Sequence, residues 1–239
     1  MIARPRKPMP WMPSLPTGDI DAMLAAIDDD VAATAHHTGR HALSERVRTA
    51  LREVRRDAFV PAVERDLAYV NHPLSIGYGQ TISQPFIVAI MTELLELAPD
   101  DTVLEIGTGS GYQAAVLARL ARAVYSVEIV PELAVQAHET LARLGYDNVQ
   151  VRAGDGTEGW PEHAPFDAII ITAAAPSVAP ALLAQLKPGG RLVAPLDIDH
   201  GSQMLTVIHK EGDRAIYRSQ FPVRFVPVTH GPKPHGAPA

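Results

Sequence analysis

Short apolar runs alternate with longer segments of helical periodicity throughout the part of the chain that follows Asp101. Five runs have the length and the apolar content of buried strands, and these are Thr102–Ile106, Val124–Val127, Val149–Arg152, Ala168–Thr172 and Arg191–Ala194. Helices are predicted between them, at Gln113–Arg122, Pro131–Leu144 and Val178–Leu186. This alternation predicts an α/β fold with a doubly wound, mostly parallel sheet and helices on both faces. Two further runs, Gln203–Lys210 and Ala215–Phe225, predict an antiparallel hairpin that extends the sheet.

The chain before Asp101 is predicted to be mainly helical, with one irregular segment. Asp19–Thr34 carries an apolar face, and Ser44 is suited to cap a helix that runs to about Ala58. Most arginines of this second helix are predicted to form a solvated face, and they are Arg46, Arg48, Arg52, Arg55 and Arg56. Tyr69–Pro85 shows little periodicity and is predicted to be a loop. Pro85 suits the first position of a helix that ends near Leu97.

These elements divide the chain into three parts. Residues 1–41 are predicted to be an N-terminal extension, partly disordered because it begins with a proline-rich stretch, with one candidate helix. Residues 42–229 form the domain that contains the sheet and a helical cap, and residues 230–239 form a loose tail. His36, His37 and His41 have no accompanying carboxylate pattern, so we expect a solvated linker and no metal site.

A glycine-rich turn joins the strand Thr102–Ile106 to the helix that follows it. Gly107, Gly109 and Gly111 have no Cβ, so the backbone can turn sharply and approach a ligand closely. This is the first strand–turn–helix unit of a nucleotide-binding fold, although its G-x-G-x-G spacing differs from the dinucleotide fingerprint. Glu128 ends the second strand, where an acidic side chain can accept both hydroxyls of an adenosine ribose. On the glycines alone, a tight turn that binds no ligand remains an alternative.

Two further polar residues are candidates for binding. Ser83 precedes the helix that starts at Pro85, so it lies near free backbone N–H groups and the positive end of a helix dipole, where an anion is stabilised. It can equally serve only as a helix cap. Asp155, between Gly154 and Gly156, can accept the exocyclic amine of an adenine, or it can form a simple Asx turn.

Composition excludes several classes of function. The 239 residues include no cysteine, which excludes disulfides, thiolate nucleophiles and cysteine-ligated metals. The net charge of -6 gives no general basic surface for nucleic acid. No run approaches the roughly 18 apolar residues of a membrane span, and the N-terminus lacks the apolar core of a signal peptide. We therefore expect a cytoplasmic protein without a membrane partner.

Two stretches carry a more specific signature, Gly79–Pro85 (GQTISQP) and Leu104–Tyr112 (LEIGTGSGY). Together they resemble the protein-L-isoaspartate O-methyltransferase family of class I S-adenosylmethionine-dependent methyltransferases. The similarity spans roughly Ser44 to Thr229, and its further segments are Val124–Glu128, Gly154–Gly156, Ala164–Ala168, Gln185–Leu192 and Val223–Pro227. The resemblance implies a seven-stranded, Rossmann-like methyltransferase sheet with added N-terminal helices.

The resemblance also implies an activity. The family transfers a methyl group from S-adenosyl-L-methionine to the carboxylate of an L-isoaspartyl residue in damaged proteins and peptides, and leaves S-adenosyl-L-homocysteine. The methyl ester then collapses to a succinimide, which begins repair. Because a carboxylate is already ionised at neutral pH, catalysis needs alignment rather than a general base. We expect a monomer that uses no metal and binds no nucleic acid.

The roles of individual residues follow from the same resemblance. Ser83 takes the place of the family's active-site serine, and Thr229 lies where the C-terminal segment closes over the substrate. The cofactor-binding residues carried over are Thr81, Ile82, Ser83, Glu105, Gly107, Thr108, Gly109, Gly111, Glu128, Gly154, Asp155 and Gly156. Of these, Glu105 and Gly107 are expected at the methionine end of the cofactor and Glu128 at its ribose. Gly154–Gly156 is expected to face the adenine.

Alternative functions remain open on sequence alone. The glycine turn and Glu128 also allow a methyltransferase that acts on a small molecule or on RNA. A second alternative is a non-catalytic protein that keeps the cofactor pocket. A nicotinamide-dependent oxidoreductase is disfavoured, because the glycine spacing differs from that of dinucleotide-binding proteins.

Overall fold

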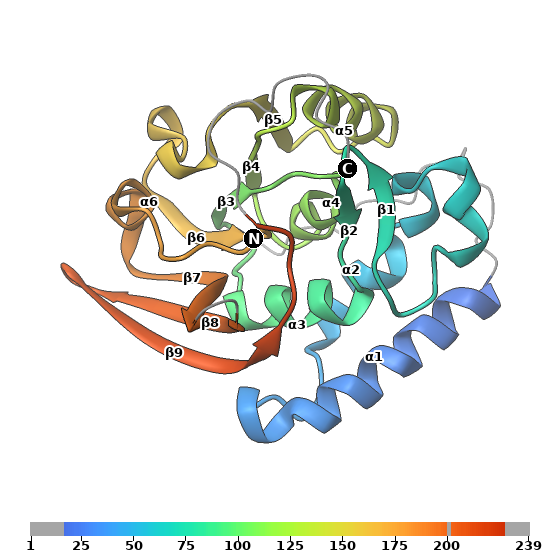
Figure 1. Ribbon diagram of the computed structural model, residues 1–239, viewed down its shortest axis with the longest axis horizontal. Coiled ribbons are helices and arrows are strands. Elements are labelled where there is room, and N and C mark those ends of the chain that lie inside the picture. The colour runs from blue at the N-terminus through green and yellow to red at the C-terminus, as the bar shows by residue number, and fades with distance from the viewer. Residues whose placement is uncertain (1–16, 200–201, 228–239) are drawn as a thin grey trace, which may run out of the picture.

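A seven-stranded sheet forms the centre of the computed structural model, which describes residues 17–199 and 202–227 (Figure 1). The strands follow the order β5-β4-β3-β6-β7-β8-β9. Their bounds are β3 (Thr102–Ile106), β4 (Ala123–Glu128), β5 (Val149–Ala153), β6 (Phe166–Ile171), β7 (Leu186–Asp199), β8 (Ser202–Glu211) and β9 (Arg214–Val223). The first five strands in this order, β5, β4, β3, β6 and β7, pair in parallel, and β8 and β9 add an antiparallel hairpin. The fold predicted from the alternating pattern is therefore confirmed.

Six α-helices surround the sheet in the described ranges. They are α1 (Thr17–Thr38), α2 (Glu45–Glu53), α3 (Pro85–Leu95), α4 (Tyr112–Ala118), α5 (Pro131–Arg143) and α6 (Pro180–Gln185). Four short 3-10 helices are η1 (Arg56–Phe59), η2 (Ala62–Leu67), η3 (Gly156–Glu158) and η4 (Pro161–His163). The predicted α2 cap is confirmed, because the Ser44 side chain accepts a hydrogen bond from Val47 N. Among the helices of the described residues, none has both the length and the apolar character needed to cross a bilayer.

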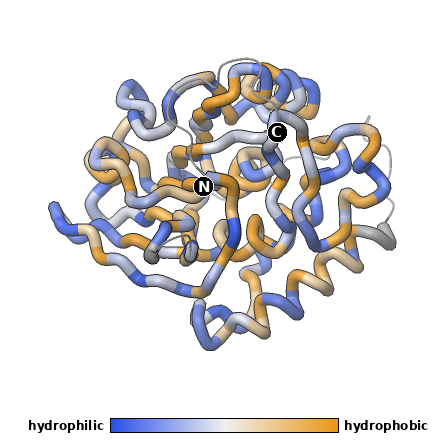
Figure 2. Tube along the Cα trace, viewed as in Figure 1, coloured by the Kyte–Doolittle hydropathy of each residue, from blue (hydrophilic) through white to orange (hydrophobic). Residues whose placement is uncertain are grey.

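Successive residues of the central strands face two different hydrophobic clusters. Val103 packs into the larger cluster, with α1 to α5, whereas Leu104 and Ile106 pack into the smaller one, with α6. All five residues of β3 are buried, as expected for a parallel strand covered on both faces. In Figure 2, hydrophilic residues mark the outward tip of the β8–β9 hairpin, far from these clusters. The cores hold β3 and β4 rigidly, and their carboxyl ends carry the glycine turn and Glu128.

Helix α1 is an integral part of the larger cluster. One face of it is completely buried, through Ile20, Met23, Leu24, Ile27 and Val31. It contacts α3 and β9. The linker expected at His36 and His37 is wrong, since both lie in the last turn of α1, but their exposure to solvent is as expected. The His37 ring lies 6.5 Å from that of Phe221. The domain boundary at residues 41 and 42 stays a prediction.

Two other expectations for the N-terminal half are corrected. Tyr69–Pro85 is not simply a loop, because it contains the hairpin of β1 (Leu74–Gly77) and β2 (Gln80–Ile82). The turn uses positive φ values at Gly77, Tyr78 and Gly79, which only a glycine-rich sequence adopts readily. Arg56 is not part of a solvated face, since it is completely buried and donates from Nε to Ala68 O at 2.8 Å. Its guanidinium also lies 5.1 Å from the centre of the Tyr112 ring.

Candidate functional site

A pocket opens at the carboxyl ends of β3, β4 and β6, where ligands bind in open α/β sheets. The walls come from the segment before α3, the glycine turn, the end of β4, η3, the end of β6 and the segment after β9. The lining residues are Gln80–Ser83, Val88, Ile106–Ser110, Tyr112, Gln113, Val127–Ile129, Gly156, Thr172, Ala173, Val226 and Pro227. Most of the site residues predicted from the sequence are therefore brought together. Glu105, Gly111, Gly154 and Asp155 lie outside these walls.

Two glycines of the pocket have no room for a side chain. A Cβ at Gly107 would overlap Oγ1 of Thr172, and φ there is +95°. The Thr172 hydroxyl lies 2.6 Å from Gly107 O, which fixes the turn against the end of β6. A Cβ at Gly156 would overlap Cγ2 of Ile106. Both glycines therefore let two loops approach each other closely at the mouth of the sheet.

The Glu128 carboxylate is held by the backbone around the pocket. Its Oε2 accepts a hydrogen bond from Gly109 N at 2.7 Å, and its Oε1 accepts one from Val130 N at 3.0 Å. Burial raises the pKa of Glu128, and these backbone bonds oppose that effect. Each oxygen keeps lone-pair capacity for another donor. Glu128 is thus a fixed pair of acceptors facing the pocket.

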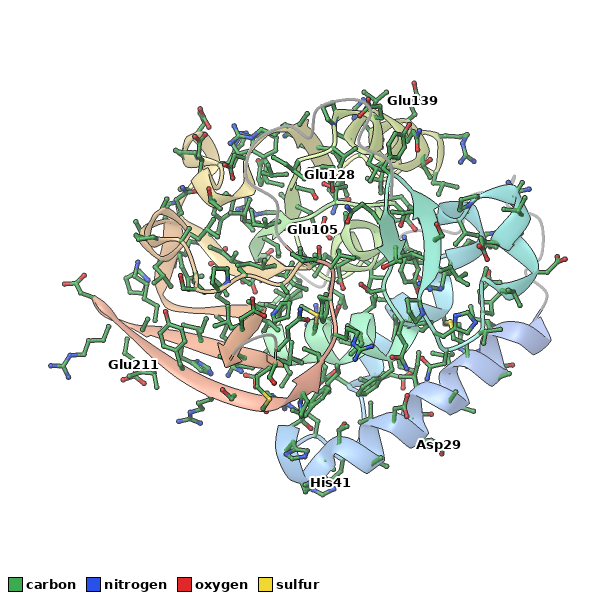
Figure 3. The ribbon with its side chains drawn as sticks, in the orientation of Figure 1. Asp29, His41, Glu105, Glu128, Glu139 and Glu211 are labelled. Carbon is green, nitrogen blue, oxygen red and sulfur yellow. The ribbon has the colours of Figure 1, made fainter. Side chains whose placement is uncertain are left out.

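Glu105 lies beneath the glycine turn and is completely buried. Its Oε2 accepts a hydrogen bond from the Ser126 hydroxyl, which in turn lies 2.5 Å from Oγ1 of Thr108. Burial raises the pKa of Glu105 to about 8, the bond from Ser126 lowers it, and the nearby Glu128 raises it. Oε1 has no partner among the described residues. Figure 3 shows Glu105 and Glu128 in the middle of the molecule, on neighbouring strands.

Asp155 adopts the Asx-type arrangement that the sequence left open. Its Oδ1 accepts hydrogen bonds from Thr157 N at 2.9 Å and from the Thr157 hydroxyl at 2.7 Å, and it caps η3. Gly154 N donates to Glu128 O at 2.9 Å, which ties this turn to the end of β4. Contact of Asp155 with an adenine stays a prediction.

Ser83 lies between β2 and α3 and is half-buried. The residue at the cap position of α3 is Gln84, without a side-chain capping bond, so Ser83 does not cap the helix. Pro85 has no N–H, Phe86 N donates to Asn71 Oδ1 at 3.0 Å, and Val88 N donates to Gln84 O. Within the described ranges, no hydrogen bond occupies the Ser83 hydroxyl. That hydroxyl is available to a ligand, whereas most N–H groups of the first turn are missing or already hydrogen-bonded.

A groove adjoins this pocket between α1, α3, the end of β9 and the segment after it. Its lining residues are Asp30, Thr34, Pro73, Thr81, Ser83, Gln84, Phe86, Ile87, Thr172 and Phe221–Pro227. Pocket and groove share Thr81, Ser83, Thr172, Val226 and Pro227. Ser83 therefore stands where the pocket meets a roomier groove. Thr229 lies outside the described residues.

Comparisons with known proteins agree with this geometry. The family model of protein-L-isoaspartate(D-aspartate) O-methyltransferase (PCMT) matches residues 32–233. The chain belongs to this family. The PCMT match confirms the resemblance carried by Gly79–Pro85 and Leu104–Tyr112.

Individual PCMT relatives are similar over most of their length. The chain is 54% identical over 210 residues to protein-L-isoaspartate O-methyltransferase 2 of Syntrophobacter fumaroxidans, covering 87% of this chain and 85% of the relative. It is 58% identical over 183 residues to protein-L-isoaspartate O-methyltransferase 1 of Nitrosospira multiformis, covering 76% and 78%. A solved protein-L-isoaspartate O-methyltransferase superposes with a TM-score of 0.79 at 27% identity, over 89% of this chain and 67% of that one.

The pocket residues fit S-adenosylmethionine, the cofactor of PCMT enzymes. Gly107 and Gly156 leave room where a Cβ would intrude, and Glu128 offers two fixed acceptors to the two hydroxyls of a ribose. The unpartnered Oε1 of Glu105 lies beneath the same turn. Within the described ranges, no group of three or more His, Asp or Glu side chains is arranged to hold a metal ion.

Several pocket residues were not predicted from the sequence. Thr172 follows the last residue of β6. A polar residue at the carboxyl end of a central strand could have indicated a place in the binding site, because ligands bind at that edge of the sheet. Gln113, on the first turn of α4, donates to Thr92 Oγ1 at 2.9 Å, which no pattern indicates. Val226 and Pro227 reach the site because the chain returns there after β9. Their place depends on the fold of the whole molecule.

Proposed function

We propose that this chain transfers the methyl group of S-adenosylmethionine to the free carboxylate of L-isoaspartyl residues in damaged proteins and peptides. The observation that carries the proposal is the position of Ser83, at the junction of the pocket and a roomier neighbouring groove. A small acceptor needs no groove, whereas a residue within a polypeptide needs room for the chain on both sides. The similarity to PCMT relatives supports the same assignment.

The acceptor carboxylate is ionised at neutral pH, so no general base is required. The Ser83 hydroxyl donates a hydrogen bond to this carboxylate and orients one oxygen toward the pocket. A neutral hydroxyl leaves that oxygen more nucleophilic than an arginine or lysine would. Buried Ile82, Val88 and Ile106 in the pocket wall exclude water from the reacting atoms. Alignment and exclusion of water are the main contributions that these residues make.

The cofactor is held by the residues around the glycine turn. Glu128 accepts hydrogen bonds from the ribose hydroxyls, and Gly107 and Gly109 bring the backbone close to the methionine part. Once bound, S-adenosylmethionine supplies an activated methyl group on a sulfonium. Thr81 and Ile82, which precede Ser83, line the pocket, and Thr81 also lines the groove.

Methyl esterification prepares the isoaspartyl residue for repair. The backbone nitrogen that follows the residue attacks the ester carbonyl, methanol leaves, and a succinimide forms. Hydrolysis of this ring returns part of the material to a normal aspartyl linkage. No residue of the enzyme needs to take part after the ester has formed.

The test is transfer of labelled methyl from S-adenosylmethionine to an isoaspartyl peptide, with the aspartyl peptide of the same sequence as the control. We expect label in the isoaspartyl peptide alone. Equal labelling of both peptides would refute recognition of the isoaspartyl linkage. Binding of S-adenosylhomocysteine without transfer to either peptide would refute the substrate and direct the search to small acceptors.

We further propose that the protein acts as a cytoplasmic monomer and has no nucleic-acid partner. The net charge of -6 supports the last point. Light scattering at micromolar concentration tests the monomeric state, and a mass above that of one chain would contradict it. The same measurement with added tRNA tests the absence of a nucleic-acid partner, and a complex of protein and tRNA would contradict that part.

A further inference from the structure

Helix α1 reaches the acceptor groove through two polar positions, Asp30 and Thr34. Its apolar face, which includes Ile27 and Val31, is buried in the larger cluster. Asp30 and Thr34 are adjacent on the helix surface, because residues four apart are neighbours, and both line the groove. Figure 1 shows α1 running beneath α3, toward β9. The helix therefore forms part of the groove wall.

The Asp30 carboxylate is bonded to both sides of the segment that contains Ser83. Its Oδ2 accepts a hydrogen bond from Asn71 Nδ2 at 2.8 Å. The same oxygen accepts one from Gln84 Nε2 at 3.4 Å, and Gln84 is the residue after Ser83. Both donors are neutral amides, so the carboxylate is the only charged member of this cluster. Bonds to a charged acceptor are stronger than those between neutral groups.

Asn71 extends this connection to the start of α3. Its Oδ1 accepts the hydrogen bond of Phe86 N at 3.0 Å. The cap residue Gln84 makes no side-chain capping bond of its own in the described structure, so Asn71 performs the task usually done by a cap side chain. Asp30 orients the Asn71 amide by holding its nitrogen, which leaves the oxygen for Phe86. The side chains of Asn71 and Gln84, which lie before and after Ser83 in the sequence, thus both donate to the Asp30 carboxylate.

We propose that Asp30 is a positioning residue for methyl transfer, which fixes the Ser83 hydroxyl through Asn71 and Gln84. This inference deepens the proposed function and rests on it. The family model begins at residue 32, so the assignment adds a part of α1 to the acceptor site. Loss of the Asp30 carboxylate frees the segment from β2 to α3 to sample other conformations. The acceptor carboxylate is then aligned for only part of the time, while the cofactor site around Glu128 is unchanged.

The first experiment compares Asp30→Ala with Asp29→Ala. Both variants remove one negative charge from the same helix, but Asp29 is exposed and points away from the rest of the molecule in Figure 3. We expect kcat/KM for the isoaspartyl peptide to fall about tenfold in Asp30→Ala. The KM for S-adenosylmethionine and the Kd for S-adenosylhomocysteine should stay within about twofold, and Asp29→Ala should match the wild type. An unchanged kcat/KM in Asp30→Ala, or an equal loss in Asp29→Ala, would overturn the proposal.

A double variant separates positioning from a general loss of structure. Asn71→Ala should lower kcat/KM by a similar factor, and Asp30→Ala added to it should lower kcat/KM little further, because the two act through one connection. Multiplied losses in the double variant would mean that Asp30 does not act through Asn71. If Asp30→Ala does not fold, Asp30→Asn replaces it, and we then expect a loss of about threefold, since the amide keeps one acceptor.

A second readout does not depend on catalysis. Hydrogen exchange of the Phe86 amide should be about tenfold faster in Asp30→Ala and in Asn71→Ala than in the wild type, with Asp29→Ala as the control. Unchanged exchange in Asp30→Ala would refute the positioning role, whatever the substrate proves to be. A wild type that does not methylate the peptide, together with faster exchange in Asp30→Ala, would instead refute the proposed function alone.

Discussion

At the scale of single residues, the site depends on side chains whose partners are already set before any ligand arrives. Glu128 is held by Gly109 N and Val130 N, and Glu105 by the Ser126 hydroxyl. Ser83 differs, because no hydrogen bond within the described ranges occupies its hydroxyl. The fixed groups suit a cofactor that binds in one way, and the free hydroxyl suits an acceptor that comes and goes.

Replacement of Ser83 by alanine should therefore affect the acceptor and not the cofactor. We expect kcat/KM for an isoaspartyl peptide to fall by about 10- to 100-fold, since the carboxylate loses the donor that orients it. The Kd for S-adenosylhomocysteine should remain within about twofold, as measured by calorimetry. A variant that keeps full turnover would remove Ser83 from the mechanism.

The buried Glu105 predicts a pH dependence of stability. Its folded pKa of about 8 lies above the ordinary value of 4.5 for a glutamate, so between these values the folded state holds a proton that the unfolded state has lost. The contribution of this group to the free energy of unfolding must fall as pH rises through that window, by at most about 1.4 kcal/mol per pH unit. Denaturant unfolding at pH 5.5 and pH 8 should show a smaller loss in Glu105→Gln than in the wild type. An equal loss in both proteins would contradict the raised pKa.

Which residues become buried was the hardest part to predict at this scale. The glycine turn and Glu128 were predictable, because their roles depend on the neighbouring sequence. Arg56 was not, because its burial depends on Ala68 O and His72 O, which accept hydrogen bonds from it within a turn formed later in the chain. Burial lowers the pKa of Arg56 to about 10, and the guanidinium still remains charged at neutral pH.

At the scale of elements, strands β3 to β6 were predictable and the short hairpin β1–β2 was not. An apolar run of five residues between turn signals indicates a buried strand. Strand β2 has three residues, too few for an alternation to stand out, and its pairing with β1 depends on the positive φ of the turn. Strand β7 begins at Leu186 and not at Arg191, because Leu186 pairs with Phe166 before a register shift.

The contact between η3 and β3 gives a prediction for an element. Gly156→Ala should lower the free energy of unfolding by about 1–3 kcal/mol, because its Cβ would overlap Ile106 Cγ2 in the core. Gly154→Ala is the matched control for stability, since its nearest neighbour is Val127 Cγ1 at 3.8 Å, an ordinary contact. Urea unfolding measures both variants. Equal stability of the two would mean that η3 moves freely relative to β3.

At the scale of the whole molecule, the pocket gathers segments from far apart in the chain, from Gln80 to Pro227. The sequence predicted the sheet that carries the cofactor residues, but it could not predict the groove. The groove depends on the packing of α1 against α3 and β9. Nothing in the sequence around His37 and Phe221 indicates that their rings come close together.

This assembly predicts that cofactor binding stabilises the whole protein. S-adenosylhomocysteine at 100 times its Kd should raise the free energy of unfolding by about 2.7 kcal/mol, if only the folded state binds it. Thermal unfolding with and without the ligand measures the effect, and Glu128→Ala should strongly reduce it. Stabilisation of the same size in that variant would contradict the ribose-binding role of Glu128.

The cap formed by Asp155 has a consequence for the lifetime of the protein itself. Asp155 is followed by Gly156, and a glycine hinders least the attack of its own nitrogen on the preceding carboxyl group. Such pairs are therefore sites where a succinimide, and from it an isoaspartyl residue, forms spontaneously. Here Oδ1 must first release Thr157 N and the Thr157 hydroxyl before the carboxyl can turn toward that attack. The hydrogen bonds that shape the turn also slow, at one of its own most vulnerable positions, the kind of damage that this protein is proposed to repair.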